Sequence, residues 1–251
     1  MANTYVKDGG VWKPLTNAYV NQSGTNTPVK NIYVNDAGSW KLAWSASYSL
    51  NILVVGGGGG AQGAGGAGYQ SSGGGGGGGV IATTYAITLG QTANITVAGQ
   101  SYSTGGQSYV YVGATQIALA DGGGTGEGYN GPGGGPSGSS GSPGYGGARQ
   151  GGPGTTAQPG GGINYTWING TTYGIGGQGE IGGGVPNYQG WGANGQLSGN
   201  TGNNISGTGV VIISYVNATQ RGTGGSVTSS GSGASTRWYH TFYGSGTYTA
   251  S

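Results

Sequence analysis

Apolar and polar residues alternate along several short segments in the middle of the chain and near its end. Their period of two is that of a β-strand with one buried face. We therefore expect a β-sheet or a β-sandwich within residues 47–216 and almost no helix. The segments are SLNILVV (49–55), VIATTYAITL (80–89), ANITVA (93–98), SYVYVG (108–113), TQIALA (115–120) and GVVIISYV (209–216).

Glycine blocks separate these segments. The chain has 67 glycines in 251 residues, and 16 of the 24 residues from 56 to 79 are glycine. The spacing of Gly56, Gly58 and Ala61 matches a dinucleotide-binding fingerprint. No helix can follow, however, because each glycine costs about 1 kcal/mol against alanine in a helix. The first acidic residue downstream is Asp121, too distant to bind a ribose, so the sequence does not indicate a nucleotide site.

Long glycine runs have one regular way to become ordered. In an extended helix with three residues per turn, N–H and C=O groups point sideways, and chains without Cβ atoms can lie side by side and pair. A collagen helix is excluded because the strict G-X-Y period is absent. We expect all-β structure with polyglycine II helices, joined by loops of polar, proline and aromatic residues. Further GGG blocks begin at Gly122, Gly133, Gly160 and Gly182.

The first 46 residues contain three related units with a period of 14 residues. They read YVKDGGVWKPL, YVNQSGTNTPV and YVNDAGSWKLA, and all four lysines of the chain lie among them. Each unit predicts a short β-hairpin with an Asx/Gly turn. So short a hairpin buries no core alone, so we expect residues 1–46 to attach to another protein, although a small self-contained β-module is the alternative. The attachment candidates are Tyr5, Trp12, Tyr19, Tyr33, Trp40 and Trp44.

Residues 217–251 are expected to form a third part of the chain. The stretch RGTGGSVTSSGSG reads as a flexible linker, and the end, STRWYHTFYGSGTYTAS, reads as a C-terminal hairpin that turns at Gly244–Gly246.

Composition narrows the function classes. Charged residues make up 5% of the chain and its net charge is +2, too little positive charge for a nucleic-acid interface. There is no cysteine, hence no disulfide or thiolate metal site, and no apolar run suited to a signal peptide or to membrane insertion. The only histidine, His240, has no acid near it in sequence, and the spacing of Asp121 and Glu127 is unfixed because glycines separate them. We expect no catalytic site, metal or cofactor.

Aromatic residues between the glycine blocks are the candidates for binding. Rigid amphipathic rings among Gly, Ser and Asn give contact area at low entropic cost, as in antibody paratopes. Arg149 could pair with an anionic group on a receptor. Alternatively, the rings cover the edges of glycine helices, and Arg149 is a solvated loop residue. The receptor-binding candidates are Tyr129, Tyr145, Arg149, Tyr165, Trp167, Tyr173, Tyr188 and Trp191.

Taken together, these features resemble the glycine-rich tail-fibre and tail-tip proteins of bacteriophages. The features are the YVKDGG-VWK and YVNDAG-SWK repeats, LNILVVGGGGG, GQTANITVAG, GTGVVIISYV and the terminal HTFYGSGTY, which together cover most of the chain. The chain is similar to receptor-binding adhesins at the tips of long tail fibres in T-even-like phages, which stack polyglycine helices between loops. It departs from them at the N-terminus, where three short repeats replace a larger attachment domain.

The resemblance implies a non-enzymatic virion protein that attaches near a fibre end and contacts a host surface receptor, either protein or glycan. Its partners would be other fibre or tail proteins. The sequence leaves open a homotrimer with intertwined hairpins or a single copy that caps a trimer. Two alternatives remain: a purely structural fibre or decoration protein whose loops contact neighbouring subunits, and a bacterial surface or matrix protein.

Overall fold

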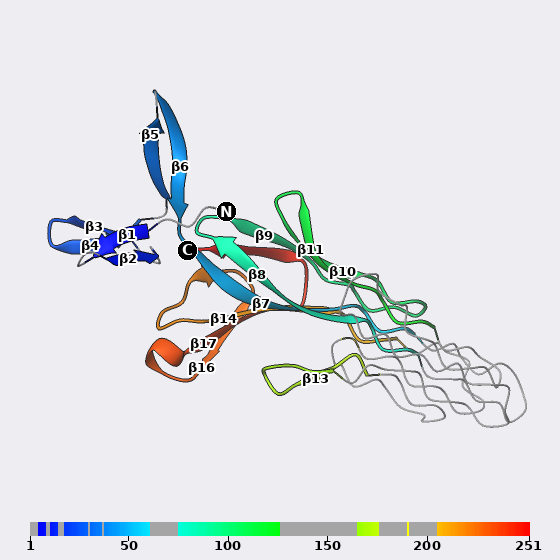
Figure 1. Ribbon diagram of the computed structural model, residues 1–251. Helices are drawn as coiled ribbons and strands as arrows, with labels where there is room; N and C mark the ends of the chain where they lie inside the picture. The colour runs from blue at the N-terminus through cyan, green and yellow to red at the C-terminus, as the bar shows by residue number, and fades with distance from the viewer. Residues whose placement is uncertain are drawn as a thin grey trace, which may run out of the picture.

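The fold consists of antiparallel β-sheets. The computed structural model describes residues 5–8, 11–14, 18–29, 31–36, 38–60, 75–125, 165–175, 190 and 205–251. Within these residues the only helical element is one turn of 3₁₀ helix, η1 (Gly233–Ser235). Two five-stranded sheets form a sandwich at the centre of the molecule (Figure 1).

The first sheet has the strand order β16-β17-β14-β7-β8, and the second has the order β11-β10-β9-β18-β15. Strands of the first sheet are β7 (Ser47–Val55), β8 (Val80–Thr88), β14 (Val210–Val216), β16 (Ser226–Ser230) and β17 (Arg237–Phe242). Strands of the second sheet are β9 (Thr92–Thr96), β10 (Ser108–Val112), β11 (Thr115–Ala120), β15 (Gly222–Thr223) and β18 (Gly246–Ala250). The alternating segments of the sequence thus form the strands that they predicted.

The main core lies between the two sheets. Leu50 and Ile213 from the first sheet pack with Val110 and Tyr248 from the second, and all four are essentially inaccessible to solvent. The expectation of one buried face is wrong for β7 and β14, because the last four residues of β7 and six of the seven residues of β14 are buried. A small hairpin, β12 (Tyr165–Thr166) and β13 (Thr172–Tyr173), packs on the outer face of the first sheet and covers its apolar end.

The C-terminal hairpin predicted from the sequence is also wrong. β17 pairs with β14 and β16 in the first sheet, whereas β18 pairs with β9 and β15 in the second. The turn after Phe242 therefore carries the chain from one sheet to the other. The stretch predicted to be a flexible linker supplies β15 and β16, so residues 217–251 belong to the sandwich. Burial of Phe242 and Tyr248 in the common core favours this pairing over a local hairpin.

Three separate two-stranded hairpins precede the sandwich. They are β1 (Tyr5–Asp8) with β2 (Val11–Pro14), β3 (Tyr19–Gln22) with β4 (Thr25–Pro28), and β5 (Asn31–Asp36) with β6 (Ser39–Ser45). The pairs Tyr5↔Pro14, Tyr19↔Pro28 and Tyr33↔Leu42 are related by steps of 14 residues, as are the three pairs that follow each of them. The three hairpins thus place their equivalent residues on equivalent faces.

The same turn device recurs in the second and third hairpins. The backbone N–H of Gly24 donates to the side-chain oxygen of Asn21 at 3.0 Å, and that of Gly38 donates to Asn35 at 2.9 Å. Both glycines have positive φ angles, 84° and 86°. An Asx side chain that binds the backbone ahead of it, followed by a glycine with positive φ, suits a tight hairpin turn.

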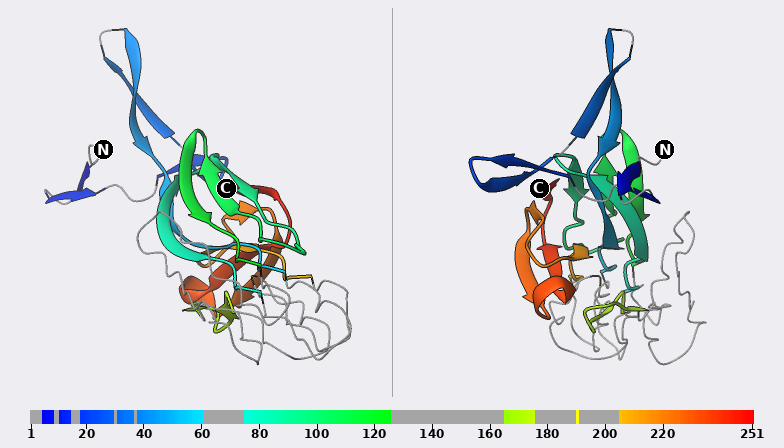
Figure 2. Two further views of the ribbon diagram at one scale, coloured as in Figure 1. Left: turned by 90° about the vertical axis from the view of Figure 1, so that its right-hand side faces the viewer. Right: turned by 60° about the vertical axis from the view of Figure 1, so that its left-hand side comes forward.

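At the other end of the sandwich, five strands continue into extended segments rich in glycine. We call these the glycine segments: 56–60 after β7, 75–79 before β8, 103–106 before β10, 121–124 after β11 and 205–209 before β14. They run side by side, away from the N-terminal hairpins (Figures 1 and 2). One end of the described structure thus consists of β-hairpins, and the other consists of glycine segments.

Candidate functional site

Backbone hydrogen bonds hold the glycine segments together, and their pattern repeats every three residues. Successive amides of segment 56–60 donate to three different neighbours in turn: segments 75–79, 103–106 and 205–209. A β-strand, with its period of two, bonds to two neighbours in one plane. The bonds are Gly56 to Gly79 (2.9 Å), Gly57 to Gly106 (3.0 Å), Gly58 to Gly207 (3.0 Å), Gly59 to Gly76 (2.8 Å) and Gly60 to Ser103 (2.7 Å).

Some of these bonds join the two sheets directly. Gly57, which continues the first sheet, donates to Gly106 of the second, and Gly123 of the second sheet donates back to the carbonyl oxygen of Gly57 at 2.9 Å. Stacked sheets normally lie about 10 Å apart because side chains fill the space between them. At Gly57, Gly106 and Gly123, which lack side chains, the backbones that extend from the two sheets come within hydrogen-bonding distance of each other.

Glycine is required at these positions on steric grounds. A Cβ atom added at Gly59, Gly78 or Gly123 would lie less than 3.0 Å from a carbonyl oxygen of a neighbouring segment. Because the obstruction is backbone, no side-chain movement relieves it. The five amides of segment 56–60 all donate to protein carbonyl groups. None of them remains to bind a phosphate, which argues against the nucleotide interpretation of this stretch.

The receptor-binding candidates divide into two groups. Tyr129, Tyr145, Arg149, Tyr188 and Trp191 lie outside the described residues. Tyr165, Trp167 and Tyr173 lie on the β12–β13 hairpin, where Tyr165 is half-buried, while Trp167 and Tyr173 are only 6% and 4% exposed.

The two buried rings pack on the outer face of the first sheet, against Leu53, Val55 and Ile212. Trp167 and Tyr173 thus cover apolar side chains of the sheet, whereas the alternative interpretation had placed the rings on the edges of glycine helices. In this arrangement neither ring offers a surface to a receptor.

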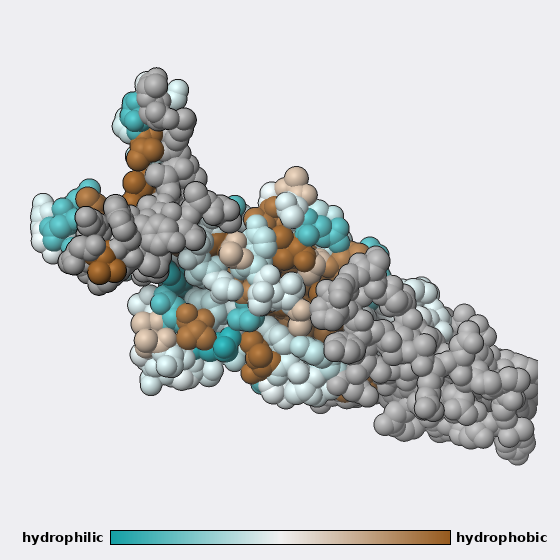
Figure 3. All heavy atoms as spheres, in the orientation of Figure 1, coloured by the Kyte–Doolittle hydropathy of each residue, from teal (hydrophilic) through white to brown (hydrophobic). Residues whose placement is uncertain are grey.

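The attachment candidates fall on the N-terminal hairpins. The side chains of Tyr5, Trp12 and Trp44 lie outside the described part of the structure. Of the other three, Tyr19 is 60% exposed, Tyr33 51% and Trp40 71%. Figure 3 shows apolar atoms along these projecting hairpins.

The hairpin registers place the aromatic candidates on corresponding faces. Tyr33 shares one face of its hairpin with Asn35 and Trp40, as Tyr19 does with Asn21 and Asn26. Six of the eleven exposed large apolar residues among those described lie between residues 11 and 40. Exposed large apolar side chains are therefore concentrated on the hairpins, as on an interaction surface.

Sequence reasoning missed a polar network in the core around His240. The histidine is fully buried, with Nδ1 2.8 Å from the carbonyl oxygen of Gly224 and Nε2 3.1 Å from the hydroxyl of Tyr215. A carbonyl oxygen only accepts, so Nδ1 carries the proton and Nε2 accepts from Tyr215. Tyr215 in turn accepts from the backbone N–H of Arg221 at 2.7 Å. The pairing of β14 with β17 brings Tyr215 and His240 together, and the segment around β15 supplies Arg221 and Gly224.

Electrostatics support a structural role for this network. Burial lowers the pKa of His240 below its ordinary value of 6.5, although the bond to Gly224 opposes the shift. Burial also raises the pKa of Tyr48, whose hydroxyl lies 2.6 Å from that of Tyr248, to about 12. The groups of this network are thus neutral at pH 7 and hydrogen-bonded to one another.

The described residues hold no cluster of three or more His, Cys, Asp or Glu side chains suited to a metal. Asp121 accepts a hydrogen bond from the Gln107 side chain at 2.6 Å, while Glu127 lies outside the described part. No helix among the described residues is long and apolar enough to span a membrane. Comparisons with protein-family models, curated proteins and solved structures give no match to this chain.

Proposed function

We propose that this protein is a non-enzymatic component of a phage tail fibre or tail tip, and that it recognises a host receptor through loops carried on a polyglycine scaffold. The hydrogen-bond pattern of segment 56–60 supports this proposal most directly. Its amides serve three neighbours in rotation. A polyglycine II helix has three residues per turn and no internal hydrogen bonds, so a rotation over three neighbours supports this part of the proposal.

Such a bundle is a rigid support for recognition. Each bonded segment restrains its neighbours, and segment 56–60 is hydrogen-bonded to segments that extend from both sheets of the sandwich. A loop that joins two restrained segments loses less entropy on binding than a loop on a mobile stem. In sequence, the candidates Tyr129, Tyr145, Arg149, Tyr188 and Trp191 lie between such glycine blocks. Together with the half-buried Tyr165, they form the proposed contact set.

The N-terminal hairpins are the proposed attachment module for residues 1–46. They lie at the end of the described structure opposite the glycine segments, as an attachment module and a receptor-binding end require (Figure 2). Their matching registers give one chain three similar faces. A partner with threefold symmetry offers three equivalent sites, so a single copy on a trimeric fibre satisfies all three hairpins. Tyr5, Trp12, Tyr19, Tyr33, Trp40 and Trp44 are the proposed anchors.

Location in the virion and adsorption together test the function. Gold-labelled antibodies against the purified protein should mark the distal end of a fibre or the tail tip. Purified protein should also block adsorption of the phage to its host, whereas the double variant Tyr129→Ala, Tyr188→Ala should not. Tyr243→Ala, an exposed tyrosine on the sandwich, is the matched control and should block like the parent protein. Labelling along the fibre shaft without any block of adsorption would instead support a purely structural fibre or decoration protein.

A further inference from the structure

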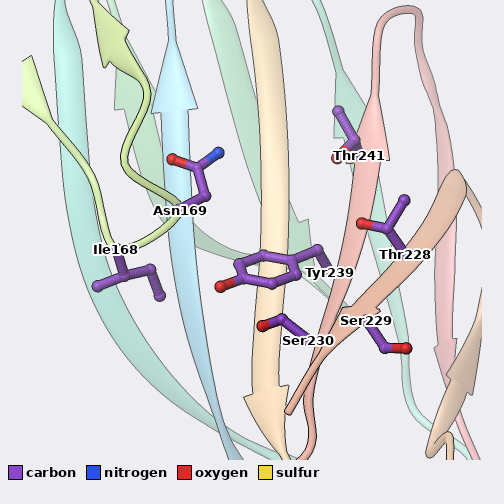
Figure 4. A pocket seen from close by; sticks show the side chains of 7 residues that line it. All are labelled: Ile168, Asn169, Thr228, Ser229, Ser230, Tyr239 and Thr241. Atoms are coloured by element: carbon purple, nitrogen blue, oxygen red, sulfur yellow. The ribbon is translucent and has the colours of Figure 1, made fainter.

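An open groove lies on the outer face of the first sheet, beside the β12–β13 hairpin (Figure 4). Its volume is about 400 Å³. Thr228 and Ser230 of β16 and Tyr239 and Thr241 of β17 form its floor, while Ile168 and Asn169 of the hairpin loop form its wall. The groove lies on the sandwich and involves none of the residues proposed for receptor contact or for attachment.

The floor of the groove is an uncharged hydroxyl surface around one aromatic ring. The register pairs Thr228 with Tyr239 and Ser230 with Arg237, so these four side chains share a face of the sheet. Within the described residues, the hydroxyl groups of Thr228, Ser230 and Tyr239 bond to no protein group. The one charged neighbour, Arg237, directs its guanidinium to the hydroxyl of Ser214 at 3.3 Å. The groove therefore offers neutral donors and acceptors.

Hydrogen bonds hold the wall in place, and a ring contact holds Tyr239. The Asn169 side chain donates to the hydroxyl of Tyr173 at 2.8 Å and accepts from the backbone N–H of Thr171 at 3.1 Å. The ring of Tyr239 meets the buried Trp167 edge-on, with centroids 6.3 Å apart. Ile168 remains 50% exposed at the rim. Figure 4 shows the Tyr239 ring projecting toward Ile168, with Ser230 beside it.

We propose that this groove binds a neutral saccharide of one or two pyranose rings. A sugar has an apolar C–H face that packs on an aromatic ring and hydroxyl groups that both donate and accept, as those of serine and threonine do. A phosphate or carboxylate ligand would need a cation in the groove, and an apolar ligand would leave the hydroxyl groups without partners. A volume of about 400 Å³ is within the range of small-molecule sites.

Saturation-transfer NMR tests the proposal with a panel of methyl glycosides of glucose, galactose, mannose and N-acetylglucosamine. At least one glycoside should receive saturation from the intact protein, with its pyranose C–H protons closest to the protein. Tyr239→Ala should abolish the transfer, and Tyr239→Phe, which keeps the ring, should retain it. Thr228→Val and Ser230→Ala should each weaken binding by about two- to tenfold, the effect of one lost hydrogen bond.

The control is Tyr243→Ala, because Tyr243 is 57% exposed and does not line the groove; this variant should bind like the parent protein. Circular dichroism should show the same fold for all variants. An absence of transfer to every glycoside in the panel would overturn the proposal and leave the groove as a solvated polar sheet face. Transfer that persists in folded Tyr239→Ala would overturn it as well. Host adsorption is not part of this test, so its outcome is independent of the proposed receptor role.

Discussion

The sandwich and the glycine segments that extend from it are held together in two different ways. In the sandwich, Leu50 and Ile213 of the first sheet meet Val110 and Tyr248 of the second across a side-chain core. Next to β7, β11 and β14 the polypeptide continues as glycine segments. The backbones of these segments hydrogen-bond directly from one sheet's side to the other's. The change occurs over a few residues, where the Cβ atoms end.

The difference shows what a side chain does for a sheet. Apolar side chains hold two sheets apart and stabilise them by about 25 cal/mol for each Å² removed from water. Without side chains, the only large stabilising terms are backbone hydrogen bonds and close packing, and they must offset the high conformational entropy of unfolded glycine. A glycine segment therefore needs several neighbours to hydrogen-bond with. The strands of the sandwich provide them because they position five glycine segments side by side.

The largest effect is expected in the sandwich. Ile213→Ala removes a fully buried side chain between the sheets and should lower the free energy of unfolding by about 2–5 kcal/mol. Denaturant titration measures the change. If the loss is below about 1 kcal/mol, the side-chain core is not what holds the sheets together.

A smaller loss is expected in the glycine segments. In Gly59→Ala the new methyl group meets the carbonyl oxygen of Gly124, and such overpacking costs about 1–3 kcal/mol. Gly99→Ala is the matched control, since its Cβ has nothing within 4 Å. Thermal unfolding of both variants should separate them, with Gly99→Ala unchanged or slightly more stable. Equal melting temperatures would show that segment 56–60 is not closely packed.

The sequence predicts features that depend on neighbouring residues, and it fails for features that depend on contacts between residues far apart in the chain. Apolar segments located β7 to β11 and β14 because burial is visible in the local sequence, and β9 and β10 show the expected period of two. The predicted C-terminal hairpin is wrong because the turn at Gly244–Gly246 is a local signal, while the pairing of β17 with β14 and of β18 with β9 depends on residues far away in sequence. The burial of Trp167 and the network around His240 were missed for the same reason.

Protonation of His240 should lower the folding stability of the sandwich at acidic pH. Its pKa is lowered in the folded state, so the unfolded chain takes up a proton first, and stability falls as the pH drops below 6.5. The slope is at most about 1.4 kcal/mol per pH unit and ends below the folded pKa. Thermal melts between pH 7.5 and 5 measure it. In His240→Gln, which removes the only histidine, the slope should be absent; an unchanged slope would assign it to other groups.

The smallest effect on stability is expected in the hairpins. Because the ring of Trp40 is 71% exposed, Trp40→Ala should change the free energy of unfolding by less than about 0.5 kcal/mol. Chemical denaturation of the isolated protein checks this, and co-sedimentation with fibres that lack the protein should show weaker attachment. A stability loss above 1 kcal/mol would mean that the Trp40 ring is part of the folded core.

Hydrogen exchange of a sample labelled with ¹⁵N at glycine and valine, which also reports on Val210 and Val211 of β14, tests the bonded bundle most directly. The amides of Gly57, Gly58 and Gly59 each donate to a different neighbouring segment, so all three should exchange slowly, at rates close to those of amides in the central strand β14. Rates typical of unfolded glycine at all three positions would contradict the bundle, and with it the scaffold on which the proposed function depends.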